Sequence, residues 1–254
     1  MTLKIDLTGH TVLVTGATGQ LGRMMVKTLG ECGASVAIHY KNSEKKALEL
    51  MENLKQNGTD ACTVQGDVSS LHEMADINSQ ITKYLDPPDI IVTNAVSQIF
   101  PWETVLNEQI EDYENQFKTC VLHNVNAAKI FVPYMQQKKW GRFIGINTEC
   151  IIQNFETQSA YVSGKGAMDK ILRVLAKEIG PDQITVNQIA PGWTISERDR
   201  KKHTEEQPQY TKDVPLRRRG TDREISNLVA FLASDLASFI TGTLIPVTGG
   251  KSTL

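Results

Sequence analysis

The sequence predicts an α/β fold in which a doubly wound parallel sheet of about seven strands carries helices on both faces. Short runs rich in β-branched residues alternate with longer amphipathic stretches along the whole 254-residue chain, and this alternation is typical of βαβ units. A glycine-rich turn also joins the first short run to the first amphipathic stretch. Such a turn is where folds of this class bind nucleotides.

The expected strands are short and apolar. The first, Thr11–Thr15, is apolar on both faces, as a strand buried between two layers of helices should be. Similar runs at residues 35–39, 61–64, 89–93, 142–146, 183–189 and 243–247 complete a set of seven.

The expected helices lie between these strands. Residues 20–31 repeat apolar side chains at helical spacing, and further helices are expected at 43–57, 71–85, 108–138, 159–179 and 221–234. Ser43 is expected to cap the second helix. Gly180 and Pro181 form a stop signal after the helix at 159–179.

No break in composition, internal repeat or low-complexity linker divides the chain, so we expect one domain over residues 1–254. Residues 193–214 are polar, charged and poorly patterned. An irregular stretch of this length is expected to be a substrate lid or a disordered surface loop. The arginines at 217–219 are expected to form a solvated charge run, with contact to an anionic substrate as the alternative.

Composition excludes several classes of function. The chain has 27 basic and 29 acidic residues and a net charge of −2, which argues against nucleic-acid or anionic-lipid partners. No apolar run approaches the ~18 residues of a membrane span, and the N-terminus lacks a signal-peptide pattern, so we expect a cytoplasmic protein. The four cysteines form no C-x-x-C pair, and neither a metal site nor a redox dithiol is expected.

The turn TGATGQLG at residues 15–22 predicts a dinucleotide-binding site of the Rossmann type. Glycines allow the backbone to approach a pyrophosphate, and the following helix offers free N–H groups to the anion. An ordinary βα turn that uses glycine only for its conformation is the alternative. The residues expected to bind the coenzyme here are Gly16, Thr18, Gly19, Gln20, Leu21 and Gly22.

The end of the second expected strand bears on the choice of coenzyme. An acidic residue about 20 positions after the glycines would bind the 2′-hydroxyl of NAD, but the sequence HYKNS at 39–43 contains none. Lys41 with its polar neighbours suits a 2′-phosphate, so NADP(H) is favoured over NAD(H). The residues concerned are Tyr40, Lys41, Asn42 and Ser43, and a solvated surface lysine is the alternative for Lys41.

Tyr161 and Lys165 lie four residues apart on an expected helix and therefore share a face. A phenol has a pKa near 10, and a neighbouring ammonium would favour its ionised form, as proton exchange near neutral pH requires. Tyr134 and Lys138 repeat this spacing. Thr148, however, stands thirteen residues before Tyr161 and directly after the fifth strand, where open α/β sheets bind ligands. We therefore predict Tyr161 as the catalytic tyrosine.

With these motifs identified, the chain resembles the short-chain dehydrogenase/reductase family, in its compact single-domain branch. The likeness spans nearly the whole sequence. It rests on TGATGQLG at 15–22, GDV at 66–68, TNA at 93–95, GRFIGINT at 141–148, YVSGK at 161–165, VNQIAPG at 186–192, PLRRRG at 215–220, FLASDLASFITG at 231–242 and VTGG at 247–250.

The resemblance implies hydride transfer between a nicotinamide and a carbonyl or secondary-alcohol substrate. Tyr161 would be the general acid in reduction, Lys165 would lower its pKa and bind the nicotinamide ribose, and Thr148 would hold the carbonyl oxygen. A 3-oxoacyl thioester or related ketone is one implied substrate, and sugars and other secondary alcohols are equally open. The remaining residues implied to contact the coenzyme are Asp67 and Val68, Asn94 and Ala95, and Pro191, Gly192, Thr194 and Ser196.

Several positions depart from the family pattern. Gln20 stands where glycine is expected, and Cys120 stands where the family has an asparagine that helps to hold a proton-relay water, with Asn124 and His123 as candidate substitutes. Val96 and Thr248 replace a glycine and an aspartate. These departures motivate a second hypothesis, a dinucleotide-binding sensor or scaffold with little turnover.

Two further expectations concern surfaces. Trp102 and Trp193 are candidates to line a substrate site. The helices at 108–138 and 159–179 carry extensive apolar surface, and the family commonly pairs these helices across subunits, so a homotetramer or dimer is expected.

Overall fold

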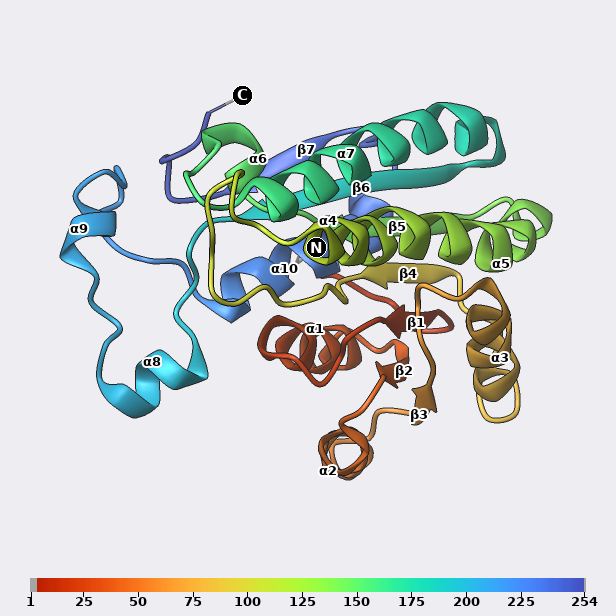
Figure 1. The fold of residues 1–254 in the computed structure, drawn as a ribbon. Coiled ribbons are helices and arrows are strands. Elements are labelled where there is room, and N and C mark those ends of the chain that lie inside the picture. Colours follow the sequence, from red (N-terminus) through yellow and green to blue (C-terminus); the bar gives the residue numbers. More distant parts are fainter. Residues whose placement is uncertain (1–3, 254) are drawn as a thin grey trace.

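The computed structural model describes residues 4–253 and contains one parallel sheet with helices on both faces (Figure 1). Its strand order is β3-β2-β1-β4-β5-β6-β7, which confirms the predicted fold class. The strands are β1 (Thr11–Val14), β2 (Ser35–Tyr40), β3 (Ala61–Gln65), β4 (Ile90–Thr93), β5 (Gly141–Ile146), β6 (Ile184–Pro191) and β7 (Leu244–Val247).

The helices follow the expected alternation, with a π-helical segment and two 3₁₀ turns added. They are α1 (Gln20–Glu31), α2 (Glu44–Gln56), α3 (Leu71–Ile81), α4 (Ile110–Gln116), η1 (Phe117–Leu122), α5 (His123–Lys138), α6 (Cys150–Gln153), α7 (Ser159–Ile179), η2 (Gly180–Asp182), α8 (Glu197–Lys202), α9 (Pro208–Thr211), α10 (Asp222–Ala233) and η3 (Asp235–Ala237). Ser43 precedes α2 without a side-chain capping bond.

Two buried clusters of apolar side chains hold the layers together. Val12 and Val14 of β1 face the cluster formed with α1, α2 and α10. Leu13 faces the opposite cluster, formed with α3, α5 and α7. Because successive side chains of a strand point to opposite faces, a strand covered on both sides has to be apolar throughout.

The order of the strands creates a crevice at the carboxyl edge of the sheet. β1 pairs with β2 on one side and with β4 on the other. The chain therefore leaves β1 and β4 toward opposite faces, and the space between their carboxyl ends stays open, as in other doubly wound sheets.

The helix expected over residues 108–138 begins at Ile110, and its interior is not uniformly α-helical. Residues 117–122 around Cys120 form a π-helical segment. Thr119, His123 and Asn124 each donate a side-chain hydrogen bond to the carbonyl four residues earlier. Such bonds compete with the regular backbone pattern, and the 3.6-residue apolar period contains no signal for this change.

Residues 193–214, called the lid below, contain two short helices, α8 and α9, that project from the body of the sheet (Figure 1). The interpretation of this stretch as wholly irregular is therefore wrong. Ser196 caps α8 in a reciprocal arrangement with Asp199.

The expected solvated run of arginines is wrong for Arg219. Its side chain is 0% exposed and pairs with Asp199 at 2.8 Å. It also donates to the Thr194 carbonyl at 2.7 Å and lies 4.4 Å from the centre of the Trp193 ring. Arg219 is thus buried because the lid supplies partners for all parts of its guanidinium group.

Within residues 4–253, none of the helices combines the length and the hydropathy that a membrane crossing would require.

Candidate active site

A cleft of about 760 Å³ runs along the carboxyl edge of the sheet. It is lined by the glycine-rich turn, the end of β2, the segments after β3, β4, β5 and β6, and the start of α7. Every residue predicted to bind the coenzyme lies on this cleft except Gly22 and Ser196. Thr148, Tyr161 and Lys165 lie on it as well.

The glycine-rich turn is shaped for close approach. Gly16 has a φ of +60°, and a Cβ there would lie 2.9 Å from the Ala95 Cα. A Cβ on Gly22 would lie 2.5 Å from the Gly16 oxygen, so Gly22 allows α1 to pack on the turn and is not itself on the cleft. Gly19 precedes α1 without a side-chain cap, and the first turn of α1 has no acidic residue.

These features fit an anionic coenzyme. The first N–H groups of a helix have no intrahelical acceptor, and neither a capping side chain nor an acid competes for them at α1. A pyrophosphate would satisfy these donors and meet the positive end of the helix dipole.

His39, which no sequence motif indicates, holds the turn in place. Its Nδ1 accepts a hydrogen bond from the Gly16 N–H at 3.0 Å, and its Nε2 donates to the Gly66 carbonyl at 3.0 Å. Burial lowers the pKa of His39 to about 4. The ring is therefore neutral at physiological pH, and its one acceptor and one donor are both used.

Asn94 ties β4 to the same turn. Its backbone N–H donates to the Thr15 hydroxyl at 2.9 Å, and its side-chain amide donates to the Thr15 and Gly16 carbonyls at 2.9 and 3.2 Å. The donors of this side chain are therefore engaged in shaping the wall of the cleft.

Lys41 and Asp67 meet at the end of the cleft near β2. Their side chains form an ion pair at 2.6 Å. Partial burial alone would raise the pKa of Asp67, but hydrogen bonds from Lys41 and Ser69 outweigh it and hold the pKa at about 2. A cation that remains 60% exposed thus lies at the mouth of the cleft.

The three predicted catalytic side chains come from two elements. Thr148 follows β5, while Tyr161 and Lys165 lie in the first two turns of α7. Burial raises the pKa of Tyr161 above its ordinary value, and the nearby Thr148 hydroxyl opposes this shift. Burial lowers the pKa of Lys165, whose Nζ donates to the Ile146 carbonyl at 2.6 Å. Burial therefore favours the neutral form of both groups.

Asn147, a second residue missed in the sequence, positions this group from behind. Its Oδ1 accepts from the Thr148 N–H at 2.9 Å. Its amide nitrogen donates to Gln188 Oε1 at 2.8 Å and to the Lys165 carbonyl at 3.2 Å. One buried side chain thus connects the end of β5 to α7 and to β6.

A second cavity of about 580 Å³ opens beside Thr148 and Tyr161. Trp102 and Trp193, the two candidates for a substrate site, both line it. The rings of Trp102 and Tyr161 meet edge to face with their centres 5.8 Å apart. Thr148 and Tyr161 line this cavity and the cleft alike, so a ligand in one would meet a ligand in the other at these hydroxyls.

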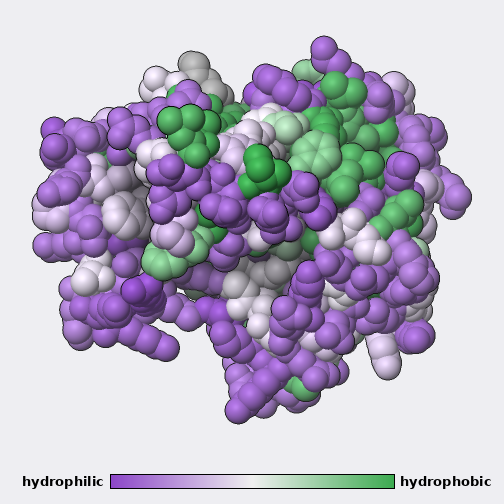
Figure 2. Space-filling model, viewed as in Figure 1, coloured by the Kyte–Doolittle hydropathy of each residue, from purple (hydrophilic) through white to green (hydrophobic). Residues whose placement is uncertain are grey.

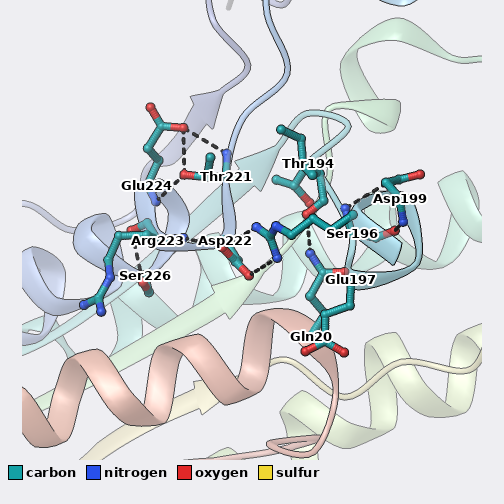
Figure 3. A network of polar contacts seen from close by, with 12 residues as sticks. Gln20, Thr194, Ser196, Glu197, Asp199, Thr221, Asp222, Arg223, Glu224 and Ser226 are labelled. Carbon is teal, nitrogen blue, oxygen red and sulfur yellow. Dashed lines mark hydrogen bonds and ion pairs between the residues drawn. The ribbon is translucent and has the colours of Figure 1, made fainter. Parts of the chain in front are cut away.

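The lid is attached to the first turn of α1 (Figure 3). Gln20 points from α1 toward the segment that carries Thr194 and Ser196, and its amide donates to the Ile195 carbonyl at 2.6 Å. Arg23 and Glu197 form an ion pair at 2.5 Å. The side chain of Gln20 thus serves a contact that glycine could not make.

Comparisons with known proteins agree with this geometry. A family model described as enoyl-(acyl carrier protein) reductase matches residues 16–252. The 3-oxoacyl-[acyl-carrier-protein] reductase FabG of Pseudomonas aeruginosa is 32% identical over 250 residues, which cover 97% of this chain and 98% of the relative. The chain belongs to the short-chain dehydrogenase/reductase family. It is therefore an oxidoreductase.

Further short-chain dehydrogenases and reductases show the same likeness. The short-chain dehydrogenase mdpC of Emericella nidulans is 31% identical over 262 residues, covering 97% of this chain and 96% of the relative. The solved structure of the promiscuous reductase LugOII, which catalyses a keto-reduction in lugdunomycin biosynthesis, has a TM-score of 0.88 at 27% identity. It covers 97% of this chain and 99% of its own.

Cys120, which the resemblance implies stands at the position of the family asparagine, lies in the π-helical segment. Asn124 does not replace it on the cleft, because its Oδ1 accepts from Thr93 at 2.7 Å and its amide donates to the Cys120 carbonyl at 2.7 Å. His123 is buried, and its Nε2 has no hydrogen-bond partner within the described residues. Neither side chain lines the cleft.

Proposed function

We propose that this protein is an NADP(H)-dependent oxidoreductase that interconverts a ketone and a secondary alcohol. The observation that carries this proposal is the position of Thr148 and Tyr161. Both line the cleft and also the second cavity, which contains Trp102 and Trp193 and is called the aromatic cavity below. A reacting carbonyl held by these two hydroxyls would lie where the two spaces meet.

The coenzyme proposal rests on charge at the end of β2. The end of β2 itself carries no acidic residue to bind a 2′-hydroxyl, and the nearby Asp67 is paired with Lys41. Lys41 lies on the cleft with most of its side chain exposed. A 2′-phosphate would compete with Asp67 for this cation. The pyrophosphate would bind at the start of α1, and the nicotinamide ribose would lie against Lys165. When bound, the reduced coenzyme supplies a hydride to the carbonyl carbon.

The chain supplies orientation and a proton. Thr148 would donate a hydrogen bond to the carbonyl oxygen, and Tyr161 would donate its proton to that oxygen as the negative charge develops. Burial of Tyr161 keeps the phenol protonated, which is the form that reduction needs. In the reverse direction the oxidised nicotinamide and a protonated Lys165 would provide the positive charge that favours the phenolate.

The proposed substrates are ketones, with 3-oxoacyl thioesters among them. The Pseudomonas aeruginosa relative is named for a 3-oxoacyl substrate, and the cavity beside Thr148 has room for a chain or a small ring system. We further propose that residues 1–254 act as one catalytic domain and that the protein works as a homo-oligomer.

Purified protein incubated with NADPH and a panel of ketones, aldehydes and 3-oxoacyl thioesters tests the proposal. Oxidation of NADPH that depends on a carbonyl compound is expected. NADPH binding without turnover of any panel member would contradict the enzyme and favour the alternative of a sensor or scaffold.

A further inference from the structure

The cavity beside the catalytic hydroxyls has aromatic walls. Trp102 comes from the segment after β4, Phe155 from the segment after α6, and Trp193 and Tyr210 from the lid. The rings of Trp193 and Tyr210 meet edge to face with their centres 5.4 Å apart. Aromatic side chains from three segments of the chain thus surround the space in which the substrate carbonyl would bind.

The same walls contain one carboxyl group. Among the described residues that line the cavity, Glu149 is the single acidic residue, and there is no lysine, arginine or histidine. Glu149 is 3% exposed and directly follows Thr148. Its Oε1 accepts a hydrogen bond from the Tyr210 hydroxyl at 2.8 Å, and its Oε2 accepts from the Ser252 hydroxyl at 3.2 Å.

Lys251 and Arg219 lie over aromatic rings of the cavity wall but are not among the residues that line the cavity. Lys251 Nζ lies 3.8 Å from the centre of the Tyr210 ring, and the Arg219 guanidinium lies 4.4 Å from the centre of the Trp193 ring. Arg219 is already paired with Asp199. Neither cation is therefore in direct contact with a ligand in the cavity.

We infer that the substrate is an uncharged ketone built on a flat ring system, and that Glu149 excludes ketones that carry a carboxylate near the carbonyl. This inference rests on the proposed function and names its substrate class. Flat rings gain from edge-to-face and stacked contacts with Trp102, Trp193 and Tyr210. A carboxylate would lose its hydration beside a buried carboxylate, with no cation in the wall to compensate.

A binding experiment tests the inference without turnover. β-Tetralone, its ring carboxylate and its ring aminomethyl derivative are titrated by calorimetry into the protein without coenzyme, so that no ketone can be reduced and no cationic nicotinamide lies beside the ligand. The N-acetylcysteamine thioester of acetoacetate serves as a linear, uncharged comparison. We expect β-tetralone to bind about tenfold more tightly than its carboxylate and more tightly than the thioester.

Two variants identify which residues make β-tetralone bind more tightly than its carboxylate. Glu149→Gln removes the charge while its amide oxygen can still accept from Tyr210, so the ratio of the two affinities should fall to about twofold or less. Lys251→Gln removes the cation behind Tyr210, so the ratio should rise. If Glu149→Gln does not fold, the order of the ligand affinities for the wild-type protein still tests the inference. The aminomethyl derivative should bind the wild type at least as tightly as β-tetralone does.

Four results would overturn the inference: equal or tighter binding of the carboxylate, an unchanged ratio in folded Glu149→Gln, tighter binding of the linear thioester, or no binding of β-tetralone up to its solubility limit. Failure of the proposed function is a different result. In that case no ketone would be reduced with NADPH, although the order of affinities could still hold.

Discussion

The side-chain amide of Gln20 donates a hydrogen bond to the main-chain carbonyl of Ile195 at 2.6 Å. This bond joins the first turn of α1 to the lid. The ion pair between Arg23 and Glu197, one turn further along α1, supports the same junction. The start of α1, where the pyrophosphate is proposed to bind, is therefore joined directly to the segment that lines the cavity beside Thr148.

The first prediction concerns this junction. Gln20→Ala should weaken NADPH binding about fivefold, because one hydrogen bond contributes about 1 kcal/mol and its loss would release the segment beside Thr194, which lines the cleft. Fluorescence titration with NADPH measures the change. Lys27→Ala, on the same helix, is the control and should bind NADPH as the wild type does. An unchanged affinity in Gln20→Ala would show that the junction has no part in binding.

The second prediction separates the two tyrosines that precede a lysine by four residues. Tyr161→Phe should lower kcat by about 10²–10⁴-fold, the usual contribution of a positioned general acid, with little change in the dissociation constant of NADPH. Tyr134 lies on α5 and lines neither the cleft nor the aromatic cavity, so Tyr134→Phe should keep full activity. Steady-state kinetics and coenzyme titration on both variants make the comparison.

The sheet could be predicted from the sequence because each strand is covered on both faces and therefore leaves a continuous apolar run. The shared placement of Tyr161 and Lys165 on the cleft could be predicted because they lie about one helical turn apart on α7. The place of Glu149 in the cavity wall could not be predicted, although it is adjacent to Thr148. Its hydrogen-bond partners are 61 and 103 residues away in the chain.

Other buried polar residues also depend on partners that are distant in the chain. Arg219 reads as one of three successive arginines, but its partners come from a segment 14–26 residues earlier that closes around it. His39 ends an apolar strand and gains its role only when the glycine turn and Gly66 meet at its ring. Such contacts depend on the assembled fold, and no local spacing predicts them.

The third prediction concerns the coenzyme. If Lys41 binds a 2′-phosphate, Lys41→Glu should reduce the ratio of kcat/KM for NADPH over NADH by about a hundredfold, because an attractive charge becomes a repulsive one. Lys45 is exposed on α2 and away from the cleft, so Lys45→Glu is the matched control. A preference that survives Lys41→Glu unchanged would require another residue to read the phosphate.

The fourth prediction concerns stability in acid. Burial lowers the pKa of His39 to about 4 and that of His123 to about 3, from an ordinary value of 6.5. The unfolded chain therefore binds more protons than the folded one as the pH falls below 6.5, and the free energy of unfolding decreases. Between pH 7 and pH 5 each histidine should account for about 2 kcal/mol of this loss.

Urea unfolding of His39→Gln at both pH values tests the account. This variant should have a lower free energy of unfolding than the wild type at pH 7. Between pH 7 and pH 5, however, its free energy of unfolding should fall by about 2 kcal/mol less than that of the wild type. His72 is 87% exposed, so His72→Gln should keep the wild-type dependence. Equal pH dependence in His39→Gln and the wild type would mean that His39 is not held in its neutral form by the fold.

The last prediction concerns assembly. Hydrophobic side chains gather over α4, α5 and α7 (Figure 2), and Ile110, Phe117 and Val174 are 68%, 49% and 54% exposed. Apolar surface of this kind gains free energy when a second copy covers it. We expect light scattering at micromolar concentration to give a dimer or tetramer, and Phe117→Asp to shift it toward the monomer. Leu48→Asp, at an exposed leucine on α2, should leave the assembly intact, so a wild-type monomer or equal dissociation of both variants would refute this interface.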